Sequence, residues 1–271
     1  MIDNIKACIL TAYAPNTSHG INIDGTPYKR GQERLIESLK YHGFRYDILA
    51  FQDWPKMKYD TSCGYNIKAA AFDEAIKQGY ERILWLDSSV WAIKKVEPLF
   101  DYIDQTGWYF YSNGFTVRQT SDDQSLAYFG MSADEAAEVG DISSSMFGLH
   151  MGNPKAQQFL EKWLQSARDG RWATSRQHNS GSQDPRYLFD RQDQTCASIL
   201  RHQLDMKMEP RNRFSAIADD DLLTMKGYQD AIQKVDNLMD RRQYEEARKI
   251  IRTIATNINT VKDVILVMRG L

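Results

Sequence analysis

The first third of the chain switches between two patterns of apolar and polar positions. Short, nearly continuous apolar runs occur at residues 6–13, 44–51 and 82–87, and such runs predict strands that are covered on both faces of a sheet. Residues 31–43 and 66–79 instead carry apolar side chains at helical spacing and end in a glycine. The succession of strand, helix, strand, helix and strand predicts an α/β domain with a largely parallel sheet.

The middle of the chain predicts more elements of both kinds. Residues 96–103 have the pattern of a short helix, and the aromatic-rich segment 107–113 predicts a strand. The mixed apolar and hydroxyl run 142–151 predicts another strand. Asn153 followed by Pro154 predicts the cap and first turn of a long helix.

The character of the sequence changes near residue 221. Residues 221–271 carry helical periodicity, and the short run VILVM is their only strand-like segment. We therefore expect an α/β domain over residues 1–220 and a C-terminal helical subdomain over residues 221–271. We expect the helices of this subdomain to pack against the α/β core or to associate with a second copy of the chain.

Composition and charge narrow the class of protein. A formal net charge of −2 provides no positive field that would attract nucleic acid, so we expect no nucleic-acid partner. Cys8, Cys63 and Cys196 are scattered without the spacing of a disulfide framework or a zinc site. The N-terminus carries Asp3 where an export signal would be basic, and its apolar run is too short to span a membrane. We expect a cytoplasmic protein without a transmembrane segment.

A carboxylate stands at the end of the third predicted strand. The apolar run stops at Asp87, which is followed by Ser88 and Ser89. In an open parallel sheet, ligands bind beyond the carboxyl ends of the strands, so Asp87 is expected to face a crevice. The alternative is that Asp87 caps the next turn together with the two serines.

Four segments, in this order along the chain, resemble glycosyltransferases of the GT-A fold. Residues 81–100 resemble the donor-site strand of these enzymes, which ends in an Asp-x-Asp signature, and residues 65–87 include the helix before it. Residues 143–167 resemble their second-half strand and Asn-Pro helix, and residues 190–206 resemble their Asp-Gln helix start. The resemblance covers residues 6–210.

This resemblance implies a fold and an activity. The fold is a GT-A-like, Rossmann-related, mixed and mostly parallel sheet flanked by helices. The activity is transfer of a sugar from a nucleotide-diphosphate sugar to a hydroxyl acceptor, which is a glycan, a small molecule or a protein.

The resemblance also implies a donor site at the edge of the sheet. The segment Thr11-Ala12-Tyr13 resembles the place where these enzymes hold the nucleotide base. Cations are needed because negative charge develops on the leaving diphosphate. The expected donor-binding residues are Thr11, Ala12, Tyr13, Arg30, Arg34, Lys68, Asp87 and Ser89.

The family usually holds Mn²⁺ or Mg²⁺ with the last carboxylate of its signature, and Ser89 stands in that position here. A serine hydroxyl is a poor ligand for these ions. Asp87 and His178 are the expected ligands if a metal binds, and the alternative for His178 is a solvated loop histidine.

Sugar and acceptor residues are expected in the second half of the chain. Asp193 is the candidate catalytic base beside Asp87, although an Asp at a helix start is also explained by capping alone. Trp172 either stacks on an acceptor sugar or anchors its loop. The other expected members of the pocket, which alternatively only fill a strand and a helix start, are Ser143, Ser144, Ser145 and Gln194.

Two other functions stay open at this point. A nucleotidyltransferase would need a glycine-rich, basic loop after the first strand, and LTAYAPNTSHGINIDG is a poor version of one. A catalytically inactive glycosyltransferase-like module for binding or assembly is suggested by Ser89, because the metal-binding carboxylate is missing.

Overall fold

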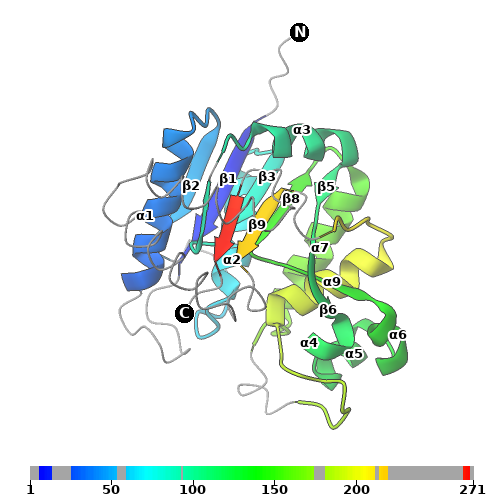
Figure 1. Cartoon of the computed structure of the whole chain (residues 1–271). Coiled ribbons are helices and arrows are strands. Elements are labelled where there is room, and N and C mark those ends of the chain that lie inside the picture. The colour runs from blue at the N-terminus through cyan, green and yellow to red at the C-terminus, as the bar shows by residue number, and fades with distance from the viewer. Residues whose placement is uncertain are drawn as a thin grey trace.

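The computed structural model describes residues 6–13, 26–53, 59–92, 94–173, 181–210, 214–218 and 265–268. Each apolar run predicted as a strand contributes to one five-stranded sheet, whose order is β2-β1-β3-β8-β5 (Figure 1). The strands are β1 (Ala7–Ala12), β2 (Asp47–Phe51), β3 (Arg82–Leu86), β5 (Trp108–Tyr109) and β8 (Met146–His150).

The sheet is mixed, with one strand reversed. β1 pairs in parallel with β2 and with β3, whereas β8 is antiparallel to both β3 and β5. Four strands therefore share one direction and β8 runs against them. Because Leu86 at the end of β3 pairs with Met146 at the start of β8, the residues that precede β8 lie beside the carboxyl end of β3. The predicted α/β class, a mixed and mostly parallel sheet flanked by helices, is confirmed.

Helices cover both faces of the sheet (Figure 1). α1 (Thr26–Tyr41) and α3 (Glu97–Thr106) pack on one face through the cluster that contains Leu35, Leu99 and Leu84. The opposite face carries α2 (Asn66–Lys77), α7 (Pro154–Arg168) and α9 (Gln192–Gln203).

A small layer of short elements lies beside α9. It consists of β6 (Ser112–Thr116), α4 (Val117–Thr120), α5 (Asp123–Phe129), α6 (Ala133–Glu138) and β7 (Gly140–Ile142). The strand predicted over 142–151 is divided here: β7 ends at Ile142, and Ser143, Ser144 and Ser145 form a turn before β8 begins. The three serines therefore lie at the edge of the sheet and not within a strand.

A second small sheet follows the end of β3. Its order is β4-β10-β9, formed by β4 (Val90–Ala92), β9 (Ser215–Ala218) and β10 (Ile265–Met268). The VILVM run thus supplies a strand that pairs with β4 just after Asp87. Residues 219–264 and 269–271 lie outside the described residues, so the helical subdomain remains a prediction there.

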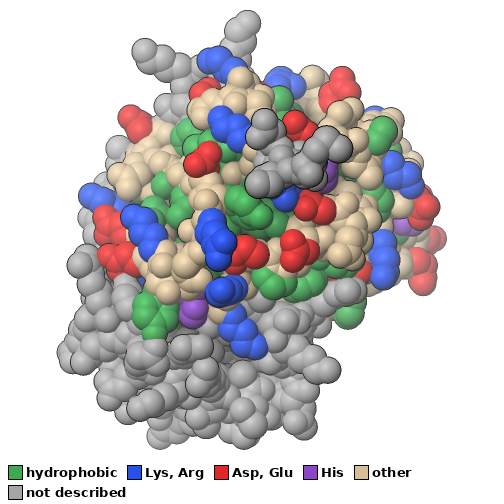
Figure 2. All heavy atoms as spheres, turned by 90° about the horizontal axis from the view of Figure 1, so that it is seen from above, with side chains coloured by type: hydrophobic (Ala, Val, Ile, Leu, Met, Phe, Trp, Pro, Cys, Tyr) green, Lys and Arg blue, Asp and Glu red, His purple; other side chains and the backbone are tan. Residues whose placement is uncertain are grey.

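The described surface carries charges of both signs. Figure 2 shows Lys, Arg, Asp and Glu side chains interspersed on the face seen from above. Within the described ranges, no helix is both long enough and apolar enough to cross a membrane.

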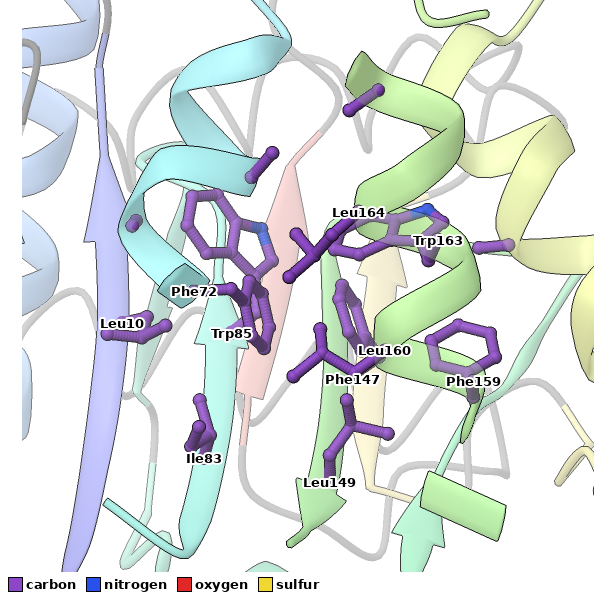
Figure 3. Close-up of a cluster of buried hydrophobic side chains, with 14 of the residues drawn as sticks. Leu10, Phe72, Ile83, Trp85, Phe147, Leu149, Phe159, Leu160, Trp163 and Leu164 are labelled. Atoms are coloured by element: carbon purple, nitrogen blue, oxygen red, sulfur yellow. The ribbon is translucent and has the colours of Figure 1, made fainter. Parts of the chain in front are cut away.

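The core between α2, α7 and the sheet is rich in aromatic side chains. Figure 3 shows Phe72 and Trp163 from the two helices meeting Trp85 and Phe147 from the sheet. Phe72 stacks on Phe147 with ring centroids 5.3 Å apart, and Trp163 meets the same two rings edge-on. Burying large aromatic surfaces stabilises this layer strongly, and the same contacts fix the position of α2 on the sheet.

Gly31 lets α1 approach the turn that follows β3. A Cβ at Gly31 would lie 2.3 Å from the carbonyl oxygen of Ser88, which is closer than side chains and backbone approach in proteins. A second contact joins the same parts of the chain, since the amide of Ala92 donates to Ser38 Oγ at 2.8 Å. The position of the Asp87 turn thus depends on the absence of a side chain at residue 31.

We predict that Gly31→Ala lowers the free energy of unfolding by about 1–3 kcal/mol, the usual cost of forcing extra atoms into a packed site. Alanine is favoured over glycine in a helix by about 1 kcal/mol, so a loss of stability would be specific to the contact. Urea unfolding measures it. The control is Gly181→Ala, where a Cβ meets nothing within 4 Å and stability should be unchanged. Equal stability of wild type and Gly31→Ala would contradict the assignment.

Candidate functional site

A buried lysine joins two carboxylates at the carboxyl end of β3. Lys68 Nζ donates to Asp193 Oδ2 at 2.7 Å and lies 3.5 Å from Asp87 Oδ1. The three side chains come from the first turn of α2, the end of β3 and the first turn of α9. Lys68 and Asp193 are 6% and 2% exposed, whereas Asp87 is 34% exposed. Asp87 is thus the member of this triad that a ligand reaches first.

Further contacts hold the triad in place. Lys68 Nζ also donates to the carbonyl oxygen of Ser144 at 3.0 Å, and Ser144 Oγ lies at 3.4 Å. The indole of Trp85 donates to Asp87 Oδ1 at 2.6 Å, and Lys68 Nζ lies 4.9 Å from the centre of the same indole. The ammonium is therefore held by several groups at once, which fixes its direction.

The environment changes the acidity of two members of the triad. Burial lowers the pKa of Lys68, but the carboxylates of Asp193 and Asp87 outweigh burial and leave that pKa above its ordinary value. Burial raises the pKa of Asp87, and Lys68 and Trp85 only partly oppose the rise. Lys68 therefore stays charged, and Asp87 takes up a proton more readily than an exposed aspartate.

Of the three serines in the turn, Ser144 is the one that bonds to Lys68. The hydroxyls of Ser143 and Ser145 instead bond to each other at 2.8 Å and to the Tyr111 hydroxyl at 2.8 and 2.9 Å. The backbone amide of Asp87 donates to the carbonyl oxygen of Ser145 at 2.8 Å, which ties the serine turn to the end of β3.

Gln194 links the triad to a carboxylate that the sequence did not indicate. Its Oε1 accepts from the amide of Ser144 at 3.3 Å, and its Nε2 donates to Asp141 Oδ2 at 2.7 Å. Asp141 belongs to β7 and is fully buried. The signal in the sequence was a single acidic residue directly before the run ISSSMFGL, which is too weak to single out.

The start of α9 is strained where it delivers Asp193. Gln192 has a φ of 41°, in the left-handed region that non-glycine residues rarely adopt. Such conformations cost roughly 1–3 kcal/mol and are concentrated at functional sites. The sequence also did not indicate Arg191, which precedes this residue. Burial and Asp193 raise the pKa of Tyr65 whereas Arg191 lowers it, so Arg191 brings positive charge to the same region.

The predicted base-binding segment lies at the end of β1. Thr11, Ala12 and Tyr13 are all buried, and Thr11 Oγ1 makes no hydrogen bond within the described structure. The Tyr13 amide donates to the Phe51 carbonyl at 3.2 Å, at the end of the neighbouring strand. Because Leu10 pairs with Trp85, two residues before Asp87, the segment lies at the same carboxyl edge of the sheet as the end of β3. Its role in holding a base stays a prediction.

The remaining predicted donor residues occupy different places. Arg34 on α1 stacks over the Trp91 indole at 4.5 Å, and Ser89 is half-buried in the turn after Asp87. Arg30 lies on α1, and its side chain is outside the described residues. His178 is also outside them.

The expectation that Trp172 offers a stacking surface to an acceptor sugar needs correction. Its side chain is fully buried, and its ring packs on Trp163 with centroids 4.4 Å apart. Its indole N–H donates to Ser166 Oγ at 2.9 Å. Trp172 therefore anchors the segment after α7 to the core and has no face open to a ligand.

The side chains of the described site do not fit the divalent ion that the resemblance implies. In the described part of the chain, no three His, Cys, Asp or Glu side chains are grouped as metal ligands. Asp87 Oδ1 already accepts from Trp85, and Ser89 brings no negative charge. Mg²⁺ and Mn²⁺ favour several anionic oxygens. The role of His178 as a ligand stays a prediction.

No protein-family model matches the sequence, and no curated protein matches it either. Three solved structures that the chain resembles are glycosyltransferases. The bifunctional glycosyltransferase WbbM is 8% identical, with a TM-score of 0.46, and the match covers 80% of this chain but only 40% of that one.

The other two structures match nearly end to end. A glycosyltransferase involved in glycosylation of the major capsid of PBCV-1 is 13% identical over 98% of this chain and 94% of that one, with a TM-score of 0.47. The galactosyltransferase LgtC, solved with donor and acceptor sugar analogs, is 12% identical over 97% and 87%, with a TM-score of 0.44. These enzymes belong to the class that the sequence resemblance indicated.

We predict that Lys68→Met lowers the free energy of unfolding by about 3–5 kcal/mol, because it leaves the buried Asp193 carboxylate without its partner. Lys68→Met combined with Asp193→Asn should recover part of the loss, since the carboxylate that remains is that of Asp87, which is one-third exposed. Urea unfolding provides the comparison. Lys155→Met is the control, because its ion pair with Asp205 is exposed and should contribute little. Equal losses in the single and double variants would show that the charges are not what matters.

We predict that Asp87→Asn raises Tm at pH 7. A carboxyl whose pKa is raised in the folded protein is more stable there in its neutral form, so its contribution to stability grows as pH falls. Asparagine mimics the neutral form and still accepts from Trp85. The difference in Tm between variant and wild type should shrink at lower pH, and a lower Tm for the variant at pH 7 would contradict the prediction.

Proposed function

We propose that the chain transfers a sugar from a nucleotide-diphosphate sugar to a hydroxyl acceptor, with the sugar bound against Asp87, Lys68 and Ser144. The observation that carries the proposal is the convergence of a buried lysine and two carboxylates at the carboxyl end of a parallel strand. Sugars present hydroxyl groups that both donate and accept, and a fixed set of charged donors and acceptors suits them.

Accessibility assigns different roles to the two carboxylates. Asp87 is one-third exposed and can accept hydrogen bonds from sugar hydroxyls. Asp193 is almost fully buried and holds Lys68 at 2.7 Å, so the base that meets the acceptor would need more exposure than Asp193 has. We therefore assign Asp193 to holding and orienting Lys68.

The leaving diphosphate needs positive charge from outside the triad. With both carboxylates ionised, Asp87 and Asp193 outweigh the single charge of Lys68. Developing negative charge on the phosphates requires further cations. In this proposal, Arg34 and Arg191 supply part of this charge, since both lie beside the elements that build the triad.

A second candidate function is a non-catalytic sugar-binding module. Ser89 favours it, because it replaces the second carboxylate of the signature that the sequence resembles. The two candidates share a binding site and differ only in turnover.

The test combines binding with turnover. We predict that at least one of UDP-glucose, UDP-galactose, UDP-N-acetylglucosamine and GDP-mannose raises Tm, because a ligand that binds only the folded state stabilises it by mass action. Each is measured with MnCl₂ and with EDTA. The effective donor should also be hydrolysed slowly, and Asp87→Ala should remove both effects, whereas Asp134→Asn, on the exposed side of α6, should leave them unchanged.

The outcomes separate the two candidates. A rise in Tm with no hydrolysis and no transfer to any acceptor would favour the binding module. If none of the four donors raised Tm or were hydrolysed with either addition, the proposed transferase would be excluded.

A further inference from the structure

A buried carboxylate stands behind the proposed sugar site. Asp141 Oδ2 accepts from Asn113 Nδ2 at 2.6 Å and from Gln194 Nε2 at 2.7 Å, and Asp141 Oδ1 accepts from the Ser198 hydroxyl. Asp141 is fully buried, and its partners come from β6 and from two successive turns of α9. None of these contacts belongs to the hydrophobic core of the sheet.

This network determines which end of the Gln194 carboxamide faces the site. An ionised carboxylate can only accept hydrogen bonds, so the group that Gln194 turns toward Asp141 must be its NH₂. A backbone amide can only donate, so the group that faces Ser144 must be the carboxamide oxygen. Both constraints give the same orientation, and neither neighbour tolerates the reversed one.

The oriented oxygen lies next to the triad. Ser144 receives the Gln194 contact through its amide, and its carbonyl oxygen accepts from Lys68 Nζ at 3.0 Å. Asp141, Gln194, Ser144 and Lys68 therefore form one continuous chain of hydrogen bonds from the buried layer beside α9 to the exposed Asp87. Gln194 thus provides a direct route from Asp141 to Ser144.

We propose that Asp141 is a positioning residue of the sugar site, which holds the Gln194 carboxamide so that its oxygen accepts from the amide of Ser144, the residue whose carbonyl oxygen holds Lys68. Its effect on turnover rests on the proposed function, whereas its effect on Gln194 does not. With asparagine at position 141, one of the two acceptor oxygens becomes an NH₂ group. An asparagine can offer Gln194 either group, so the orientation of the Gln194 carboxamide is then supported by the Ser144 amide and no longer by residue 141.

Protonation of Asp141 has the same consequence as this substitution. Burial raises the pKa of Asp141 to about 6, although the hydrogen bonds from Ser198, Asn113 and Gln194 oppose the rise. Among the groups described around it, Arg201 on α9 brings a positive charge, and Asn113, Gln194 and Ser198 are neutral. A proton on the carboxyl removes acceptor capacity, so the hold on Gln194 weakens as pH falls through about 6.

The experiment compares Asp141→Asn with Asp134→Asn, whose carboxylate is exposed. With the donor identified above, wild-type and Asp134→Asn kcat should fall between pH 7 and pH 5 with a midpoint near 6. Asp141→Asn should lack this step and should have a kcat at pH 7 lower by about tenfold or more, the loss of one transition-state hydrogen bond. If Asp141 had a purely structural role, Asp141→Asn would have a lower Tm, and its remaining activity would still fall near pH 6.

A second measurement does not depend on turnover. The side-chain ¹⁵N resonances of Gln194, assigned by their loss in Gln194→Glu, should be protected from hydrogen exchange at pH 7.5. They should lose this protection as pH falls through about 6, and they should lack it at every pH in Asp141→Asn. If wild type turns over no donor but Gln194 behaves in this way, the proposed function fails and the positioning by Asp141 stands. Unchanged protection of Gln194 in Asp141→Asn would overturn the positioning, whatever the activity.

Discussion

The ion pair between Lys68 and Asp193 determines how the elements around the sheet edge meet. Taking an ammonium and a carboxylate out of water costs several kcal/mol per ion, and only short, well-directed contacts offset that cost. Lys68 makes such contacts with Asp193, Ser144 and Asp87, which belong to α9, to the turn before β8 and to the end of β3. Neither helix can shift without exposing or unpairing a charge, so the pair fixes α2 and α9 relative to the strand between them.

The fold could be predicted where local pattern and tertiary burial agree. The runs at β1, β2 and β3 are apolar because both faces of these strands are covered, and their length and spacing identify them without further information. The helices α4 and α5 were not predicted, because elements of four and seven residues have too few turns to display a period. The strand expected over 142–151 was too long, because the expectation included the three serines of the turn. Hydroxyl side chains in Ser143 to Ser145 are compatible with a strand locally, and only their contacts with Tyr111 and Lys68 make them a turn.

The site could be predicted as far as single strand ends and helix starts are informative. Asp87, Lys68 and Asp193 were all expected near a ligand, and the structure brings them together. No sequence pattern indicated that Asp193 would be buried against Lys68. Asp141 was not found, because its importance lies in three partners that are distant in sequence. For Trp172 the sequence left open whether the indole stacks on a sugar or anchors its loop, and the contact with Trp163 is what identifies it as an anchor. In each case the deciding contact joins residues that are distant in sequence, and a local sequence pattern does not show such a contact.

The charged side chains at the sheet edge form two surroundings of opposite sign. Around Lys68 the carboxylates are in excess, and burial raises the pKa of Asp87 further. That environment suits a neutral ligand with many hydroxyls, and it disfavours a phosphate. Arginine side chains instead lie to either side, with Arg34 over Trp91 after the Asp87 turn and Arg191 before the strained start of α9. The proposed donor, whose sugar and diphosphate ends need opposite surroundings, matches this division. The left-handed backbone of Gln192 separates Arg191 from Asp193, one residue from each of the two surroundings.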